Sequence, residues 1–351
     1  MTTKTATGTT CKRSRWRFAQ AMLVVAGAAA TGLAAFPALS ASASPAHAKP
    51  ATAPLAIPRA SQALAQSAAA DDHSHSISSL PVRVIHITSG REGATITIRG
   101  HWRMARLSRP PMRLVAPHTL RPASPHSTVQ ATSPFWSGYV DTGHNVAFRY
   151  VAANFTAPSV NCTASPLGTA GSEAGGSVGL DFWSNSDAAA VGYGEGCDSF
   201  GPYPFVWYQV CEPSCTGQAF YGVNPGDALN GGVYYNSSAR QYQLTLTDLT
   251  QTSTGFSVDA SGAGPNSSAE VVTYAPAGGP VAGTNLSDFG AIGYLNAAVT
   301  SRDGVRGNLA SNSLWNSNNV TMTNSATGDK LATAGPLQGG TAFLDTWNAP
   351  Y

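Results

Sequence analysis

The chain alternates apolar and polar residues over many short segments. In residues 241–247, Tyr242, Leu244 and Leu246 fall on one face, with Gln and Thr on the other, as in a strand with one buried face. Similar short runs occur at residues 148–155, 219–223, 232–235, 256–258, 270–274, 292–299, 320–323 and 342–347. Turn residues such as Asn224-Pro225-Gly226-Asp227 separate them. Many short strands without a helical period predict an all-β antiparallel sandwich or barrel.

Composition agrees with this fold class and limits the number of domains. Only 11% of the 351 residues are charged, and there are 36 Gly and 23 Pro, which argues against helical bundles and coiled coils. After the N-terminus no apolar run approaches the ~18 residues that span a bilayer, so we expect no stable membrane insertion. Residues 134–351 are expected to form one domain.

The N-terminus has the features of an export signal. Basic residues at Lys12, Arg13, Arg15 and Arg17 precede an apolar stretch at residues 21–39, which ends near the small residues Ala41-Ser42-Ala43. This order is typical of a secretory signal peptide. Residues 1–43 are therefore predicted to be the signal, and the protein is predicted to be secreted to the extracellular space.

Charge divides the remaining chain into two parts. Residues 44–133 contain ten basic and three acidic residues, a formal charge of +7, whereas residues 134–351 contain five basic and fifteen acidic residues, a charge of −10. The basic part is either a solvated linker or a removable pro-segment held on the domain by complementary charge. Alternation at residues 82–87 and 94–98 predicts a hairpin within it. Secretion makes a nucleic-acid partner for its arginines unexpected.

Four cysteines follow the signal: Cys162, Cys197, Cys211 and Cys215. An even number in an exported chain predicts two disulfides, and three pairings are possible. We favour Cys211 with Cys215 across a tight loop, and Cys162 with Cys197 between longer connections. A zinc site is not expected because His144 is the only histidine from residue 134 onward.

Several familiar kinds of catalytic site are excluded. With one histidine, the domain cannot readily build a Ser-His-Asp or Cys-His arrangement. Asp141-Thr142-Gly143 occurs once, in a domain too small for the two lobes of an aspartic peptidase. The glycines of residues 192–196 are not followed by Lys and open no helix, so they do not form a phosphate-binding loop. No cofactor or metal is expected.

Five short motifs occur in order along residues 135–347. They are Trp136-Ser137-Gly138-Tyr139 with Phe155-Thr156-Ala157-Pro158, then Val178-Gly179-Leu180-Asp181, Trp207-Tyr208-Gln209, Pro225-Gly226-Asp227 and Ser268-Ala269-Glu270. Each motif alone is weak, but the series resembles the glutamic peptidases, or eqolisins.

The resemblance implies a fold, a mechanism and a set of site residues. The implied fold is a concanavalin-like sandwich of two long antiparallel sheets whose concave face binds extended peptide. Glu270 matches the family's catalytic carboxylate, which activates a water while a Gln amide polarises the scissile carbonyl. The substrate-binding residues are expected to be Trp136, Asp181, Trp183, Trp207 and Tyr208. This implies a secreted acid endopeptidase that acts on polypeptides and is made as a zymogen, with its own pro-segment as inhibitor.

The chain departs from the family at the glutamine. That residue is expected about nine to eleven positions after Asp181, where this chain has Ala190-Val191-Gly192. Gln209 and Gln218 lie elsewhere, and Tyr274 replaces a second acidic residue of the family pattern. A second function therefore stays open, namely a catalytically silent β-sandwich that binds peptide or glycan at the cell surface. Hydrolysis of an unfolded protein in acid distinguishes the two.

Overall fold

The computed structural model describes residues 82–89, 92–105, 128–143, 145–164, 172–183, 185, 187–212, 214–251, 254–276 and 286–348. The predicted signal peptide lies outside the described residues. Apart from the short 3-10 helix η1 (Cys162–Ala164), the regular elements are strands, and nearly all of them pair antiparallel. The all-β prediction is confirmed. Within the described part of the chain, no helix is long and apolar enough to cross a membrane.

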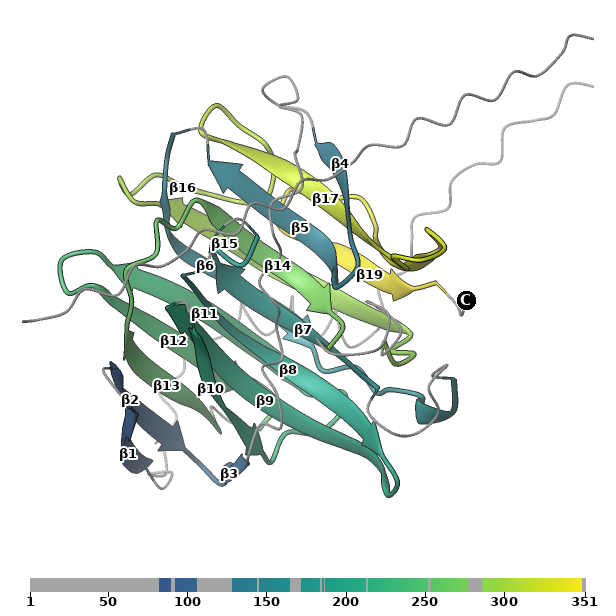
Figure 1. Cartoon of the computed structure of the whole chain (residues 1–351), viewed down its shortest axis with the longest axis horizontal. Coiled ribbons are helices and arrows are strands. Elements are labelled where there is room, and N and C mark those ends of the chain that lie inside the picture. The colour runs from purple at the N-terminus through teal and green to yellow at the C-terminus, as the bar shows by residue number, and fades with distance from the viewer. Residues whose placement is uncertain are drawn as a thin grey trace, which may run out of the picture. The chain divides into compact units, whose positions relative to one another are not determined.

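The strands form two layers (Figure 1). In the first layer, each strand is hydrogen-bonded to the next in the order given below. From edge to edge they are β3 (Arg103–Ala105), β10 (Ser214–Tyr221), β9 (Gly201–Glu212), β8 (Ala188–Asp198), β7 (Glu173–Leu180), β14 (Ser268–Tyr274), β5 (Trp136–Gly143), β17 (Trp315–Thr323) and β4 (Val129–Ser133). Only the pairing between β4 and β17 is parallel.

The second layer is also continuous. Its strands are β1 (Val82–Ser89), β2 (Glu92–Arg99), β13 (Thr254–Ser261), β12 (Gln241–Asp248), β11 (Ala228–Asn236), β6 (Phe148–Thr156), β15 (Ala291–Ser301) and β19 (Phe343–Trp347), with β16 (Arg306–Gly307) beside β15. Strand β18 (Lys330–Ala334) pairs with both β17 and β19, so the hydrogen-bonded ladder passes from one layer to the other.

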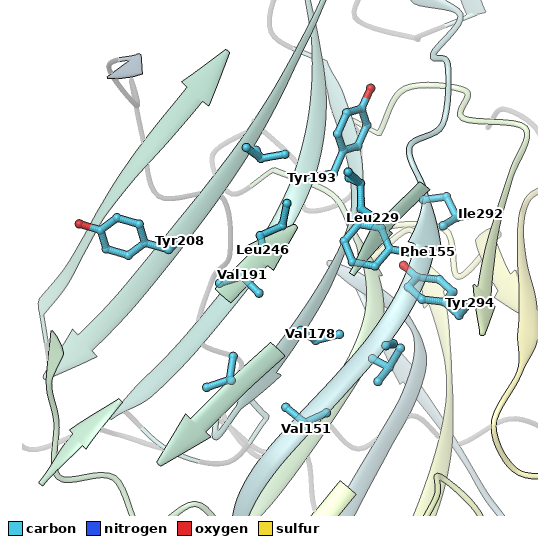
Figure 2. Close-up of a cluster of buried hydrophobic side chains, with 14 of the residues drawn as sticks. Val151, Phe155, Val178, Val191, Tyr193, Tyr208, Leu229, Leu246, Ile292 and Tyr294 are labelled. Carbon is cyan, nitrogen blue, oxygen red and sulfur yellow. The ribbon is translucent and has the colours of Figure 1, made fainter. Parts of the chain in front are cut away.

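The main hydrophobic core lies between the layers (Figure 2). Phe155, Leu229 and Leu246 of the second layer belong to one buried cluster with Val178 and Val191 of the first. Burying each such side chain stabilises the fold by about 1.5–3 kcal/mol before chain entropy is counted. Alternate residues of the paired strands supply this core, which confirms the predicted sandwich.

Strand β8 was not predicted from the sequence, and its burial explains why. Ten of its eleven residues are buried, so its apolar residues do not alternate with polar ones. Glycine at residue 192 is required by close packing, because a Cβ there would lie 2.5 Å from the carbonyl oxygen of Gly176. An Ala- and Gly-rich strand buried on both faces therefore lacks the usual strand signal.

The strands before residue 134 extend both layers. The predicted hairpin is confirmed as β1 and β2, and β2 pairs with β13. Ile96 and Ile98 are fully buried in the main core, and the Trp102 ring centroid lies 6.2 Å from that of Phe256. Strand β3 extends the other layer at β10. β4, at the opposite edge of the first layer, also belongs to the basic segment, so the described parts of this segment pack as sheet.

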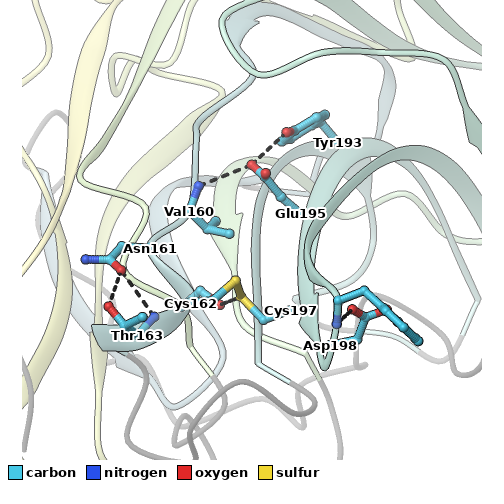
Figure 3. Close-up of a disulfide and its surroundings, with 10 residues drawn as sticks. Val160, Asn161, Cys162, Thr163, Tyr193, Glu195, Cys197 and Asp198 are labelled. Carbon is cyan, nitrogen blue, oxygen red and sulfur yellow. Dashed lines mark hydrogen bonds between the residues drawn. A yellow bond between two sulfur atoms is a disulfide. The ribbon is translucent and has the colours of Figure 1, made fainter.

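Both favoured disulfides are present. Cys162–Cys197 joins η1 to the end of β8 (Figure 3), and Cys211–Cys215 bridges directly opposite positions of β9 and β10. The predicted pairing is confirmed, and the second bridge lies two residues from Gln209 on the same strand.

Candidate active site

Glu270 lies in a row of directly opposite residues that crosses the first layer. Its neighbours are Val140 on β5 and Gly179 on β7, and the row continues through Ala190 on β8 to Gln209 on β9. Opposite residues point to the same face of a sheet. The two smallest side chains of the row therefore separate the Glu from the Gln.

This face of the first layer looks away from the main core, and we call it the Glu270 face. It has its own buried cluster, made of residues from the first layer and from the turn after β7. The aromatic members Trp136, Trp183, Trp207 and Tyr274 surround the row. The Trp136 and Trp183 ring centroids are 5.8 Å apart, and Trp207 meets Tyr274 edge-on at 5.4 Å. Three of the predicted substrate-binding residues are thus brought together beside Glu270.

The two carboxylate oxygens of Glu270 have different surroundings. Oε1 accepts hydrogen bonds from Ser268 Oγ at 2.6 Å and from the Trp183 backbone N–H at 3.2 Å. Oε2 has no hydrogen-bond partner and lies over the neighbouring strand, 3.3 Å from where a Cβ on Gly179 would be. One oxygen is therefore held by the protein, and the other is directed along the row toward Ala190.

Burial controls the protonation of Glu270. The side chain is fully buried, and this burial raises its pKa to about 8, with a further increase from Asp181. The hydrogen bonds from Ser268 and Trp183 oppose this increase in the pKa. The carboxyl therefore holds its proton in acid in the form described here.

Asp181 has a different environment from the one expected of a substrate-binding residue. It is fully buried, with a positive φ of 70°. Its carboxylate accepts backbone N–H groups from Asn266, from Ser267 at 2.6 Å and from Ser268 at 3.3 Å. The Asn185 amide donates to it at 2.7 Å. Asp181 thus fixes the turn that leads into β14, two residues before Glu270.

Replacing this carboxylate should destabilise the fold. In Asp181→Asn, one acceptor oxygen is exchanged for an NH₂ group that faces backbone N–H donors, which should lower the free energy of unfolding by about 2–4 kcal/mol. Urea unfolding followed by tryptophan fluorescence measures the change. Asp303→Asn, at an exposed position, is the matched control. An unchanged midpoint for Asp181→Asn would contradict this role.

Tyr208 is not on the Glu270 face. It belongs to the main core, where its ring centroid lies 6.4 Å from Phe220 and 6.1 Å from Phe256. Successive residues of a strand point to opposite faces, and Trp207 and Gln209 occupy the Glu270 face. The same alternation could have separated Trp207 from Tyr208 in the sequence.

Residues 190–192, where the family resemblance places a glutamine, do not all point to the same face of the sheet. Ala190 lies in the row with Glu270, Val191 points into the main core, and Gly192 lies on the Glu270 face one row away. A side chain at Gly192 would meet Trp207 at 2.7 Å. Of these three positions, residue 190 is the one at which a glutamine side chain would lie in the same row as Glu270.

The sequence did not reveal one polar group of this face. The Tyr274 hydroxyl accepts a hydrogen bond from Trp207 Nε1 at 2.9 Å and donates one to Glu173 Oε1 at 2.9 Å. Glu173 on β7 thus brings a carboxylate to the hydroxyl of Tyr274, the residue that stands where the resemblance expected an acid. The two residues are 101 positions apart, so no local pattern in the sequence connects them.

Comparison with protein families identifies the chain. A model of the peptidase A4 family matches residues 134–334, more than half of the sequence. The chain belongs to the peptidase A4 family. This confirms the resemblance to the eqolisins, and the protein is a peptide hydrolase of the glutamic type. No curated protein matches the chain.

Solved structures give weaker likenesses. Aspergilloglutamic peptidase from Aspergillus niger is 19% identical, with a TM-score of 0.40, and the match covers 50% of this chain and 99% of that one. Lectin I from Ulex europaeus is 12% identical, with a TM-score of 0.18, over 55% of this chain and 84% of the lectin. At these TM-scores neither likeness supports a structural argument.

Residues that could hold a metal do not gather in this part of the molecule. Across the residues that the structure describes, no group of three or more His, Cys, Asp or Glu side chains could hold an ion.

Proposed function

We propose that this A4 peptidase is a secreted acid endopeptidase in which Glu270 activates the attacking water. The arrangement of its carboxylate carries the proposal, since Oε1 is held by Ser268 and Trp183 while Oε2 is unpartnered and lies over Gly179. A general base needs a fixed position and one oxygen available to the water. The disulfides agree with an oxidising, extracellular location.

The reaction needs only Glu270 and the substrate for its proton transfers. Glu270 takes a proton from water as the water oxygen bonds to the scissile carbonyl carbon, and the carbonyl electron pair moves onto its oxygen. The same carboxyl then gives that proton to the leaving amine as the C–N bond breaks. Trp136, Trp183 and Trp207 flank the row and are proposed to bind the side chains of an extended peptide.

The fully buried state of Glu270 supports synthesis as an inactive precursor. Water reaches the carboxylate only after the Glu270 face is uncovered. Uncovering also removes the desolvation that raises the pKa, so that the bonds from Ser268 and Trp183 then favour the ionised form. We propose that residues 44–133, with their charge of +7 against −10 for the domain, are the covering pro-segment.

The ends of the described strands support this assignment. β3 ends at Ala105 on one edge of the first layer, and β4 begins at Val129 on the opposite edge. Both strands belong to residues 44–133, so this segment supplies both edge strands of the first layer, on either side of the row that contains Glu270.

Acid should convert the full chain to an active, shortened form. Below a pH of about 4 the carboxylates of the domain gain protons while the arginines of the segment stay charged, so that mutual attraction is lost. Full-length protein moved from pH 7 to about pH 3–4 is expected to release fragments of residues 44–133 and to begin digesting a denatured protein. Mass spectrometry and release of acid-soluble peptides measure the two events.

The wild type kept at pH 7 is the control for this conversion. A segment that stays intact and bound at pH 3 would contradict the precursor proposal. Peptide release by the full-length chain without any loss of the segment would contradict it as well.

A further inference from the structure

We propose that Gln209 on β9 is the amide donor that polarises the scissile carbonyl, in place of the glutamine missing from residues 190–192. This assignment rests on the proposed function of Glu270. Gln209 is fully buried on the Glu270 face and lies in the same cross-strand row as the catalytic carboxylate. The donor is thereby placed one strand further from Glu270 than position 190.

The span of the row suits a water and a carbonyl group between the two side chains. Glu270 and Gln209 are three strand spacings apart, so their Cα atoms are separated by roughly 14 Å. Each side chain extends about 5 Å from its Cα. When both side chains lean fully inward they leave roughly 4–5 Å, and when they stand upright from the sheet they leave more, so intermediate orientations hold a water and a carbonyl group between them.

The residues between them keep this space open. Gly179 has no side chain and Ala190 has only a methyl group, and Glu270 Oε2 already lies over Gly179. On its other side Gln209 is opposite Gly217. A glutamine at position 190 would bring the amide one strand closer, whereas alanine there requires the longer reach from β9.

One hydrogen bond of the amide is to sulfur and can be exchanged. Gln209 Nε2 donates to Cys211 Sγ at 3.3 Å, and sulfur is a weak acceptor. The oxygen of a substrate carbonyl is a stronger acceptor, above all when it gains negative charge as water adds to the carbon. Redirecting the N–H from sulfur to that oxygen stabilises the charge without moving a proton.

Other amides of the described residues are less suitable. Gln218 is directly opposite Tyr208, so it lies on the core side of the sheet. Asn318 is in the row beyond Val140, but its amide donates to the Val140 carbonyl at 2.7 Å and to Thr142 Oγ1 at 3.1 Å. Gln209 lies in the same cross-strand row and on the same face of the sheet as Glu270, and we therefore choose it as the donor.

The test compares acid-activated full-chain variants on denatured protein. Gln209→Met keeps the length of the side chain and removes the donor, and it should lower kcat about 10²–10³-fold with KM changed less than about threefold. Gln218→Ala, on the opposite face, should keep kcat within about twofold. Thermal unfolding confirms that each variant is folded. A Gln209→Met enzyme with the wild-type kcat overturns the assignment.

A second variant distinguishes a donor from a structural residue. Adding Ala190→Gln to Gln209→Met returns an amide to the same row, and kcat should recover at least about tenfold. No recovery, together with an equal loss of thermal stability in both variants, overturns the assignment in favour of a packing role. Full activity of Gln209→Met with an inactive Glu270→Gln overturns this inference alone, whereas activity of Glu270→Gln overturns the proposed function.

Discussion

Glu270→Gln is expected to eliminate hydrolysis and leave the domain folded. The amide has nearly the same shape, and its oxygen can still accept the bonds from Ser268 and Trp183. It cannot take a proton from water, and losing a general base lowers turnover by about 10²–10⁴-fold. Release of acid-soluble peptides from denatured protein near pH 3–4, after acid activation, measures the loss.

Glu212→Gln, a change of the same chemistry at the end of β9, is the control and should retain activity. Hydrolysis by Glu270→Gln at the wild-type rate would falsify the glutamic mechanism. A wild type that binds peptide or glycan without cleaving it, even after complete removal of the pro-segment, would instead support the catalytically silent sandwich.

Stability of the folded domain should fall as the pH rises from 4 to 8. Burial raises the pKa of Asp345 to about 6, that of Glu270 to about 8 and that of Asp141 well above its ordinary value. A carboxyl with a raised folded-state pKa contributes most stability below its unfolded pKa, and the contribution is lost as pH rises toward the folded value. The shift of the Asp345 pKa corresponds to about 3 kcal/mol in total, of which about 2 kcal/mol is lost between pH 4 and 6.

Urea midpoints measured at intervals across this range test the expected fall. Asp345→Asn should flatten the pH dependence between pH 4 and 6, because the amide needs no proton to be buried. Asp303→Asn, at an exposed position, should leave the curve unchanged. Midpoints that rise or stay constant from pH 4 to 8 would show that the buried carboxyls are stabilised as anions.

The fold was predictable wherever one face of a strand is buried. Strand β12 alternates visibly because its Gln and Thr residues face away from the main core. β2 alternates for the same reason, with Ile96 and Ile98 buried and Arg99 exposed. β8 was missed because both of its faces are buried, and small residues such as Ala190 and Gly192 carry little information about which face they occupy.

The site was predictable only in part. A local motif ending at Glu270 pointed to that residue, but no local pattern connects it with Gly179, Ala190 and Gln209. These residues are brought into one row by the register of four strands, which is set by long-range pairing. The function of Asp181 was also hidden, because its partners are backbone N–H groups more than eighty residues away.

The strands of the basic segment cover edges of both layers that would be exposed if the segment were removed. β2, with β1 beyond it, covers the edge of β13, β3 covers the edge of β10, and β4 covers the edge of β17. All four belong to the basic segment that we propose is removed. An uncovered edge presents unpaired N–H and C=O groups that can join another chain. If the segment is removed as we propose, it also protects the sandwich from edge-to-edge aggregation until that point, and the shortened enzyme then has to tolerate three bare edges.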